Sequence, residues 1–402
     1  MSDFHQAGPI TTLHKLGRLL PDEMNEKIGK FAERRPVALI LPSLITEMDG
    51  EALPRILKAL KSVKYLSKIV ITLGPATEEA FARARSFFGR LPQDIRLIWN
   101  NGPRLSKLYL RLEETGLSAG PDGKGRSVWM AMGYLLSEGT AKVIALHDCD
   151  IVTYDRELLD RLVFPVINPD MGYQFCKGYY ARYSDRLHGR VTRLFVSPLI
   201  RALMRIVGNL PVLTYLDAFR YPLSGEFCLT DDMARGLRIP SNWGLEIGVL
   251  SEVFENSSLQ RVCQSELCDR YDHKHQVLST SPEKGLLKMA SDIAKILFRI
   301  LSSEGVMLSS TFFDTLKTTY LHHAHLAAGQ YQDEALINGF TYDRHEELLK
   351  VETFMEAIAH AGKDFIEKPE ERLPLIPSWR RVDAALPSFL LDLKKAIDAD
   401  NV

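Results

Sequence analysis

The chain has 402 residues, of which 46% are hydrophobic, so it can bury a substantial core in one large domain with an appendage. Its formal net charge of -1 excludes the broad basic field that binds nucleic acid or an anionic membrane, so we expect neither partner and only local phosphate recognition. Five scattered cysteines without a CxxC pair, no signal-peptide core and no long apolar run predict a cytoplasmic protein with free thiols.

Strands that alternate with helices are predicted for the first part of the chain. An apolar run at 37–42 is followed by helical spacing over 49–63, and a second pair follows with a strand at 68–73 and a helix at 77–88. A third strand is predicted over 95–99. Such alternation indicates a largely parallel sheet with right-handed crossovers, whose ligands bind at the carboxyl ends of the strands. The predicted fold class is therefore α/β, with a Rossmann-like sheet flanked by helices.

A glycine-rich segment, residues 117–125, precedes an apolar helix predicted over 128–136. Such a turn exposes backbone N–H groups to an anion at the helix start, and Lys124 adds a full positive charge. The spacing is not that of a P-loop, because Lys124 lies between two glycines with no hydroxyl residue directly after it. A surface loop with an ordinary lysine is the alternative. The acidic residues after the next strand favour a binding site, since they would share one cleft with Lys124.

Two carboxylates follow a short apolar strand predicted over 143–146. Asp148 and Asp150 are therefore expected at the carboxyl edge of the sheet. Carboxylates this close repel each other in a dry cleft, so we expect them to hold a hard divalent cation that also takes phosphate oxygens. The alternative is a solvated strand end with an Asx turn. A metal-bridged phosphate substrate is the first hypothesis for function.

The segment after the two acids places an arginine at a predicted helix start. A strand is expected over 171–175, and a strongly apolar helix that Pro198 interrupts is expected over 191–207. Arg190 precedes this helix, where its guanidinium can grip an anion bidentately while Thr192 donates a hydroxyl. Taken alone, such an arginine is more often a solvated surface residue.

Three further features carry acids or histidines. Glu246 lies in an otherwise apolar helix start, and because a buried acid needs a partner, it is a site candidate. His273 is a candidate third metal ligand, although a polar loop histidine is the simpler interpretation. The run His322–His325 lacks the spacing of a metalloprotease helix, so a helix surface is favoured there.

Composition and periodicity divide the chain into three parts. We predict an N-terminal helical segment over residues 1–35, a catalytic domain over 36–280 and a helical C-terminal extension over 281–402. The extension suggests a surface for dimerisation, so we expect a homodimer. Helical periodicity in this part covers residues 286–301, 311–326 and 348–358.

These residues together resemble the GT-A-fold retaining glycosyltransferases that make glucosyl-3-phosphoglycerate, and their mannosyl-3-phosphoglycerate relatives. The resemblance runs from about Val37 to His275 and rests on six motifs in order along the chain. The motifs are Gly123–Gly125, Asp148–Asp150, Gly189–Thr192, Pro222–Glu226, Gly244–Gly248 and the Arg-x-x-His segment Arg270–His273.

The resemblance implies roles for individual residues. Those that look like the nucleotide-sugar site are Pro42, Ser43, Leu44, Lys124, Asp148 and Asp150. Those that look like the site for Mg²⁺ or Mn²⁺ are Asp150 and His273. Those that look like the acceptor site are Gly189, Arg190, Thr192 and His275. Those expected at the transferred sugar and the reacting atoms are Leu223, Glu246, Lys124 and Asp150.

This chain departs from the family pattern at three places. Ile45–Glu47 stands where the family usually has Asn-Glu-Glu, and Thr72–Pro75 stands where it usually has Asp-Ser-Gly-Ser. Both changes touch the nucleoside pocket, so the base of the donor is left open. His275 replaces the usual asparagine near the acceptor.

The resemblance implies transfer of a hexose, preferably glucose, from a nucleoside diphosphate sugar to 3-phosphoglycerate, with retention at the anomeric carbon. UDP-glucose or GDP-mannose is the expected donor, and the expected product serves compatible-solute or polysaccharide-precursor synthesis. Three alternatives stay open: a mannosyl-3-phosphoglycerate synthase using GDP-mannose, a sugar nucleotidyltransferase, and an inactive nucleotide-sugar binding protein. A nucleotidyltransferase usually carries a glycine-rich signature after its first strand, where this chain has Pro42–Thr46.

Overall fold

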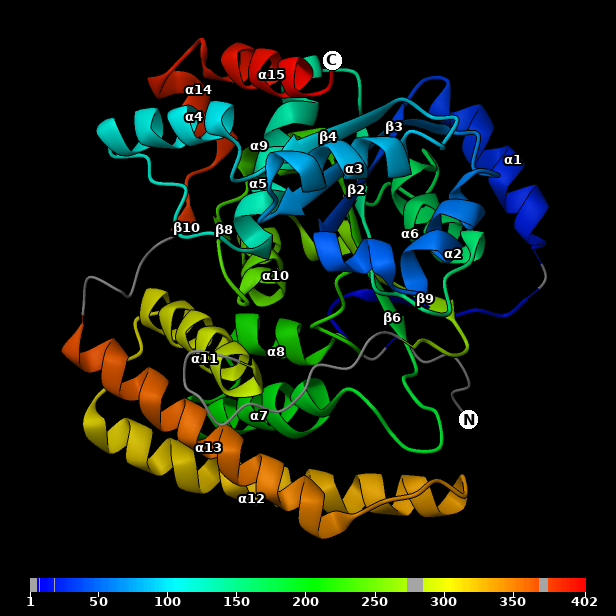
Figure 1. The fold of residues 1–402 in the computed structure, drawn as a ribbon. Helices are drawn as coiled ribbons and strands as arrows, with labels where there is room; N and C mark the ends of the chain where they lie inside the picture. Colours follow the sequence, from blue (N-terminus) through cyan, green and yellow to red (C-terminus); the bar gives the residue numbers. More distant parts are fainter. Residues whose placement is uncertain (1–5, 7, 18, 273–284, 369–374) are drawn as a thin grey trace.

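The centre of the molecule is an eight-stranded, mostly parallel sheet (Figure 1). The computed structural model describes residues 6, 8–17, 19–272, 285–368 and 375–402. Within this sheet β7 runs antiparallel to its neighbours β5 and β6, and the other described pairings are parallel. In sheet order the strands are β1 (Thr11–Leu13), β9 (Val262–Cys268), β6 (Phe175–Tyr180), β7 (Phe227–Thr230), β5 (Val143–Leu146), β2 (Val37–Leu44), β3 (Leu66–Gly74) and β4 (Ile95–Trp99).

Helices cover both faces of this sheet, which explains why its strands are apolar without alternation. In β2, Leu39 and Leu41 face one apolar cluster, whereas Ala38 and Ile40 face the other. The first cluster is built with α1 (Pro21–Ala32), α2 (Ala52–Leu60), α3 (Glu78–Phe88) and α6 (Arg156–Ile167). The second is built with α4 (Pro103–Glu114), α5 (Lys124–Glu138), α7 (Ser197–Val207), α8 (Pro211–Asp217), α9 (Asp231–Gly236) and α10 (Leu245–Asn256), and with the later helices.

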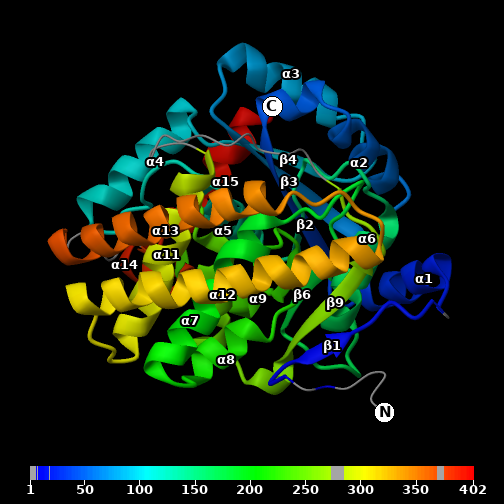
Figure 2. The same ribbon diagram turned by 90° about the horizontal axis from the view of Figure 1, so that it is seen from below.

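The C-terminal helices lie in two places. Helices α11 (Gly285–Ser303), α12 (Ser310–Ile337) and α13 (Arg344–Glu367) pack together below the sheet, and α12 packs on α7. Figure 2 shows α12 and α13 running side by side. Helices α14 (Trp379–Ala385) and α15 (Phe389–Asp400) return to the top of Figure 1, where α15 packs on α5 and β4. The proposed domain boundary near residue 281 stays a prediction.

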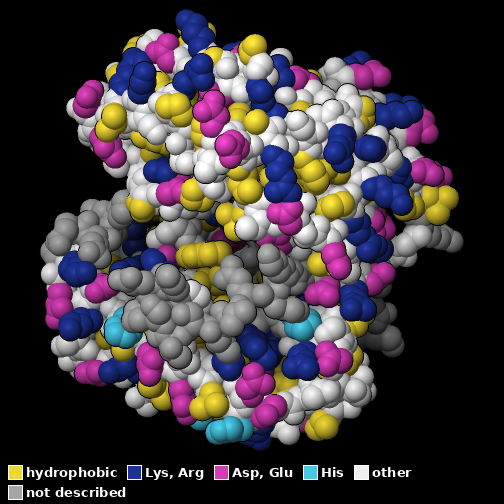
Figure 3. Space-filling view, viewed as in Figure 1, with side chains coloured by type: hydrophobic (Ala, Val, Ile, Leu, Met, Phe, Trp, Pro, Cys, Tyr) yellow, Lys and Arg dark blue, Asp and Glu magenta, His cyan; other side chains and the backbone are white. Residues whose placement is uncertain are grey.

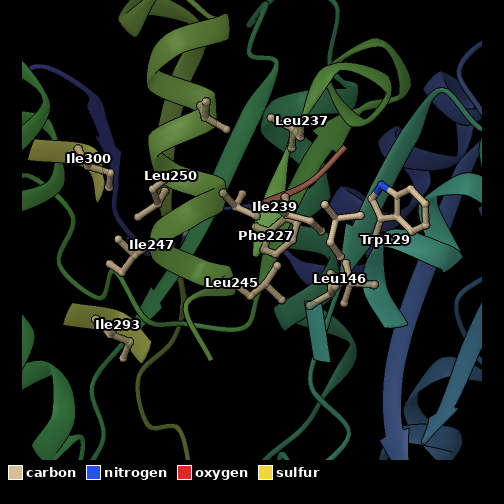
Figure 4. Packing of buried hydrophobic residues seen from close by; sticks show 14 of the residues in the cluster. Trp129, Leu146, Phe227, Leu237, Ile239, Leu245, Ile247, Leu250, Ile293 and Ile300 are labelled. Carbon is tan, nitrogen blue, oxygen red and sulfur yellow. The ribbon is translucent and has the colours of Figure 1, made fainter. Parts of the chain in front are cut away.

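One apolar core joins the sheet to the lower helices. Figure 4 shows Trp129 and Leu146 at one side of this core and Ile293 and Ile300 of α11 at the other, with Leu245 of α10 between them. A small second sheet, β8 (Ile239–Pro240) with β10 (Leu375–Ile376), ties the C-terminal segment to the same region. The α11 helix is therefore part of the main core.

The predicted fold class is confirmed, and several element bounds are corrected. The strand expected over 171–175 is β6, Phe175–Tyr180. The helix expected over 191–207 begins as a π-helix, Val191–Val196, and continues as α7, whose first turn tolerates Pro198. No helix of the described residues is long and apolar enough to cross a membrane.

Candidate active site

Two adjoining cavities open at the carboxyl ends of the central strands. The strand-end cavity, about 950 Å³, is lined by residues at the carboxyl ends of β2 and β3, including Ser43 and Thr72, and by residues that follow β5. The arginine cavity, about 510 Å³, is lined by Arg182, Arg186 and Arg190. Figure 3 shows that the molecule is hollowed between its upper, sheet-bearing part and its lower helices. The residues common to both cavities are Lys124, Asp148, Asp150 and Trp243.

Lys124 is the electrostatic centre of this shared region. It is the first residue of α5, and its Nζ lies 2.7 Å from Asp148 Oδ1 and 2.9 Å from Glu246 Oε1. Burial lowers the pKa of the Lys124 ammonium, but the Asp148 and Glu246 carboxylates outweigh burial and raise this pKa above its usual value. Lys124 therefore stays charged, and it forms ion pairs with both Asp148, a predicted nucleotide-sugar residue, and Glu246.

Asp150 lies in the region that both cavities share, close to the carboxylate of Asp148. Burial, and next the Asp148 carboxylate, raise the pKa of Asp150 to about 7. A divalent cation fits such a site, since Mg²⁺ is often held by one or two carboxylates together with substrate phosphates and water. No three acidic, histidine or cysteine side chains converge on a metal position within the described residues. The predicted ligand His273 lies outside the described residues, so the metal assignment stays a prediction.

Buried residues next to Asp148 and Asp150 support these two carboxylates. A Cβ added at Gly225 would lie 2.2 Å from Asp148 Oδ2, so only glycine fits against this carboxylate. The next residue, Glu226, is fully buried and accepts hydrogen bonds from the hydroxyls of Tyr180 (2.6 Å) and Tyr271 (2.9 Å). Burial, and next the Asp148 charge, raise the pKa of Glu226. Residues of the Pro222–Glu226 motif therefore help to fix the position of the Asp148 carboxylate.

Lys177 is a site-supporting residue that the sequence analysis did not identify. This lysine of β6 is fully buried, and its Nζ donates to the carbonyl oxygen of Ser224 at 2.5 Å. Ser224 also donates through its hydroxyl to the Gly178 carbonyl, at 2.7 Å. The two bonds hold the turn that carries Leu223 into the arginine cavity. A lysine inside an otherwise apolar strand was the available signal, because buried lysines need a specific partner.

The strand-end cavity contains the predicted nucleoside residues Pro42, Ser43 and Leu44. The departures from the family pattern line the same cavity through Thr46, Glu47, Thr72, Gly74 and Pro75. Helix α11 adds Lys288 and Asp292, which form an ion pair with each other. Asp292 is buried, and its Oδ2 has no hydrogen-bond partner among the described residues. The region after residue 281 therefore contributes to this cavity, which the sequence did not indicate.

The arginine cavity contains the predicted acceptor residues that the structure describes. Gly189 has a φ of +73°, which favours glycine, and it leads into the π-helix. Arg190 and Thr192 line the cavity together with Leu223 and Glu246. The Thr192 hydroxyl is buried and has no hydrogen-bond partner within the described residues. His275 lies outside the described residues.

One expectation for the glycine-rich turn is wrong. The backbone N–H groups of Gly125 and Arg126 donate to the carbonyl oxygen of Ser241, at 3.1 Å and 3.4 Å. A Cβ at Gly125 would lie 1.8 Å from the Pro240 oxygen, so this glycine serves close packing. These two N–H groups face Ser241, and the Lys124 side chain is what the turn contributes to the shared region.

The chain is similar to curated proteins along its whole length. The glucosyl-3-phosphoglycerate synthase of Persephonella marina is 49% identical over 401 residues, covering 100% of this chain and 99% of that protein. The enzyme of the same name from Methanococcoides burtonii is 36% identical, covering 99% of this chain and 98% of its own length. No family model matches the chain.

Solved structures confirm the fold. The Mycobacterium tuberculosis glucosyl-3-phosphoglycerate synthase in complex with Mn²⁺, UDP-glucose and phosphoglyceric acid superposes with a TM-score of 0.54 at 20% identity, covering 76% of this chain and 90% of that one. The Rubrobacter xylanophilus mannosyl-3-phosphoglycerate synthase gives a TM-score of 0.56 at 19% identity, covering 75% and 83%. By its full-length similarity to the first two relatives, the chain belongs to the glucosyl-3-phosphoglycerate synthase family of GT-A glycosyltransferases.

Proposed function

We propose that this protein transfers glucose from a nucleoside diphosphate glucose to 3-phosphoglycerate, with retention at the anomeric carbon. The observation that carries the proposal is that Lys124, Asp148 and Asp150 line both cavities. A donor in the strand-end cavity and an anionic acceptor in the arginine cavity would meet at these residues. The family of the chain, together with the ligands that the M. tuberculosis structure contains, supports this choice of substrates.

Departure of the diphosphate is the step that most needs charge stabilisation. Asp150, with Asp148 nearby, would hold the divalent cation, which supplies Lewis-acid stabilisation of the leaving group. Lys124 adds a permanent positive charge at the same place because two carboxylates keep it protonated. Preorganised charges of this kind lower a barrier by several kcal/mol.

Positioning of the acceptor is assigned to the start of the π-helix. The Arg190 guanidinium would bind an anionic group of 3-phosphoglycerate, and Thr192 would donate its hydroxyl to the same molecule. The acceptor hydroxyl would then approach the anomeric carbon on the face that the diphosphate leaves. A leaving phosphate oxygen can take the acceptor proton, so no protein base is assigned. Glu246 would orient sugar hydroxyls from the first turn of α10.

A donor panel tests the proposal. The purified chain is incubated with 3-phosphoglycerate, Mg²⁺ or Mn²⁺ and either UDP-glucose, GDP-glucose, ADP-glucose or GDP-mannose, and release of nucleoside diphosphate is followed. We expect release with a glucose donor, and an α-linked product by proton NMR. No release with any donor, or release only with an acceptor that lacks phosphate, would overturn the assignment. Preference for GDP-mannose would favour the mannosyl alternative.

Three further predictions accompany this function. We place the product in compatible-solute or polysaccharide-precursor synthesis, as the family resemblance implies. A homodimer and a cytoplasmic location are the accompanying expectations. Analytical ultracentrifugation of the purified chain tests the dimer directly.

A further inference from the structure

A carboxylate from the C-terminal helices holds the acceptor arginine. The Arg190 Nε–H donates to Glu347 Oε1 at 2.9 Å, and Arg190 Nη2 lies 3.6 Å from Glu346 Oε1. Both glutamates belong to the first turn of α13, more than 150 residues further along the chain. A guanidinium has five N–H donors, so the bond through Nε leaves others for a ligand in the arginine cavity, which Arg190 lines.

Glu347 is itself fixed by a second arginine. Its other oxygen, Oε2, accepts from Arg193 Nη2 at 2.8 Å, and the Glu347 side chain is 7% exposed. Arg193 also donates through Nε to the His188 carbonyl oxygen at 2.8 Å, and its guanidinium lies 4.8 Å from the ring centre of Tyr331 on α12. Tyr331 therefore contacts Arg193, which is hydrogen-bonded to Glu347, and Glu347 is hydrogen-bonded to Arg190. These successive contacts can fix the orientation of the Arg190 guanidinium.

The connection between α12 and α13 contacts the same side of the cavity. The N–H of Thr341 donates to the Asp185 carbonyl oxygen at 2.8 Å, and the rings of Phe340 and Tyr183 stack at 5.4 Å. Asp185 belongs to the segment 182–188, most of which lines the arginine cavity. The two helices therefore support this wall of the cavity as well as Arg190.

We propose that Glu347 is a positioning residue, which orients Arg190 for the anionic group of the acceptor. The inference rests on the proposed function, since it assumes that 3-phosphoglycerate occupies the arginine cavity. Without Glu347, Arg190 loses its charge-assisted hydrogen bond and faces Arg193 without the intervening carboxylate. A guanidinium with several accessible rotamers must be ordered by the ligand, which weakens acceptor binding.

If the contact between Glu347 and Arg190 had the opposite role, the KM for 3-phosphoglycerate would change in the opposite direction. If Glu347 mainly competed with the acceptor anion for Arg190, its removal would free positive charge and tighten acceptor binding. Positioning instead predicts weaker acceptor binding with little change for the donor. The two roles are therefore separated by the direction in which the KM for 3-phosphoglycerate moves.

The experiment uses the full chain and its steady-state kinetics. For Glu347→Ala we expect the KM for 3-phosphoglycerate to rise roughly tenfold, as loss of a charge-assisted bond of about 1.4 kcal/mol implies, while the KM for the donor changes less than about twofold. Glu347→Gln keeps one acceptor oxygen and should give a smaller rise, and it carries the test if the alanine variant does not fold. Glu352→Gln, exposed on the same helix, is the matched control and should behave as the unsubstituted chain.

A double-mutant cycle with Arg190→Ala tests whether Glu347 acts through Arg190. In that background Glu347→Ala should add less than about twofold to the KM for 3-phosphoglycerate, because the group it positions is gone. A lowered or unchanged KM for the single variant, or a full additional rise in the double variant, overturns the inference. Failure of the proposed function looks different: the unsubstituted chain makes no product from 3-phosphoglycerate, or Arg190→Ala leaves its KM unchanged.

Discussion

At the scale of single residues, the position of the Asp148 carboxylate depends on Gly225, which lies against it. The Cβ of an alanine at position 225 would meet Asp148 Oδ2 at 2.2 Å and Cγ at 2.5 Å, so the carboxylate must move. We expect Gly225→Ala to lower kcat/KM about a hundredfold, since small displacements at a reacting centre have effects of this size. The measurement is steady-state turnover with the donor that the panel selects.

A matched glycine separates this effect from a general effect of the substitution. Gly29 lies within α1, where an added Cβ meets nothing within 4 Å. Gly29→Ala should leave turnover unchanged and raise the free energy of unfolding by about 0.5–1 kcal/mol. If both variants keep full activity, the account of Asp148 is wrong.

Lys177 gives a pH-dependent prediction for stability. Burial lowers the pKa of Lys177 to about 8 from 10.5, so between these values the unfolded chain binds more protons than the folded one. The contribution of neutral Lys177 to the free energy of unfolding is therefore fully present above pH 10.5, and it is lost as the pH falls towards 8. Relative to Lys177→Met, the unsubstituted chain should gain up to about 1.4 kcal/mol in free energy of unfolding for each pH unit over this range.

Urea unfolding of both chains at pH 8 and pH 10 measures this difference. Parallel pH dependence of the two unfolding free energies would show that Lys177 does not titrate in this range. The acidic groups that face Lys177 are Glu246, Glu226 and Asp148, and Lys124 lies on the same side. The three carboxylates oppose the effect of burial on the pKa of Lys177, whereas the Lys124 charge acts in the same direction as burial.

At the scale of elements, α5 is held by a helix from the other end of the chain. The Trp379 ring stacks on Trp129 with centroids 3.9 Å apart, and each indole N–H donates to a backbone oxygen of the other segment. Because α5 begins with Lys124, this contact also supports the active site. We expect Trp379→Ala to lower the free energy of unfolding by about 3–5 kcal/mol.

Chemical denaturation measures this loss, and Leu391→Ala is its control. Leu391 is a hydrophobic residue of α15 that is 53% exposed, so its removal should change the free energy of unfolding by less than about 0.5 kcal/mol. A loss below about 1 kcal/mol for Trp379→Ala would contradict the proposed role of the contact.

Several elements were predictable because local pattern and burial agree. The strands over 143–146 and 95–99 have the predicted bounds, since each is a short apolar run that is buried in the sheet. The strand β6 was misplaced because its inner residues include Lys177 and tyrosines, whose burial depends on partners far along the chain. The start of α5 was placed too late because Lys124 to Ser127 carry no apolar periodicity and are held instead by contacts with Ser241.

The candidate site was predictable in part for the same reason. Asp148, Asp150 and Lys124 could be placed together, because the carboxyl ends of neighbouring strands share one edge. Asp292 lines the strand-end cavity and Glu347 accepts a hydrogen bond from Arg190 of the arginine cavity. Both belong to helices more than 100 residues beyond Asp148 and Asp150, and no local pattern marks such tertiary contacts. The family resemblance ended near residue 275 and offered no assignment for either residue.

At the scale of the whole molecule, the C-terminal helices share the core of the sheet. Residues of α11, α13 and α15 belong to the same apolar cluster as β5 and β7. A chain that ends at residue 280 would expose this cluster, so we expect no cooperative thermal transition by circular dichroism. A cooperative transition in the truncated chain would show instead that residues 36–280 fold as an independent domain.

The central claim is that the acids shared by both cavities serve a cation-dependent transfer of glucose to 3-phosphoglycerate. The most direct measurement is product formation by the chelator-treated chain as Mn²⁺ is added back, compared with Asp150→Asn under the same conditions. We expect turnover of the unsubstituted chain to rise from near zero to saturation with Mn²⁺, and Asp150→Asn to lose at least about a hundredfold at every concentration. Full turnover without a divalent cation, or an Asp150→Asn variant as active as the unsubstituted chain, would contradict the account.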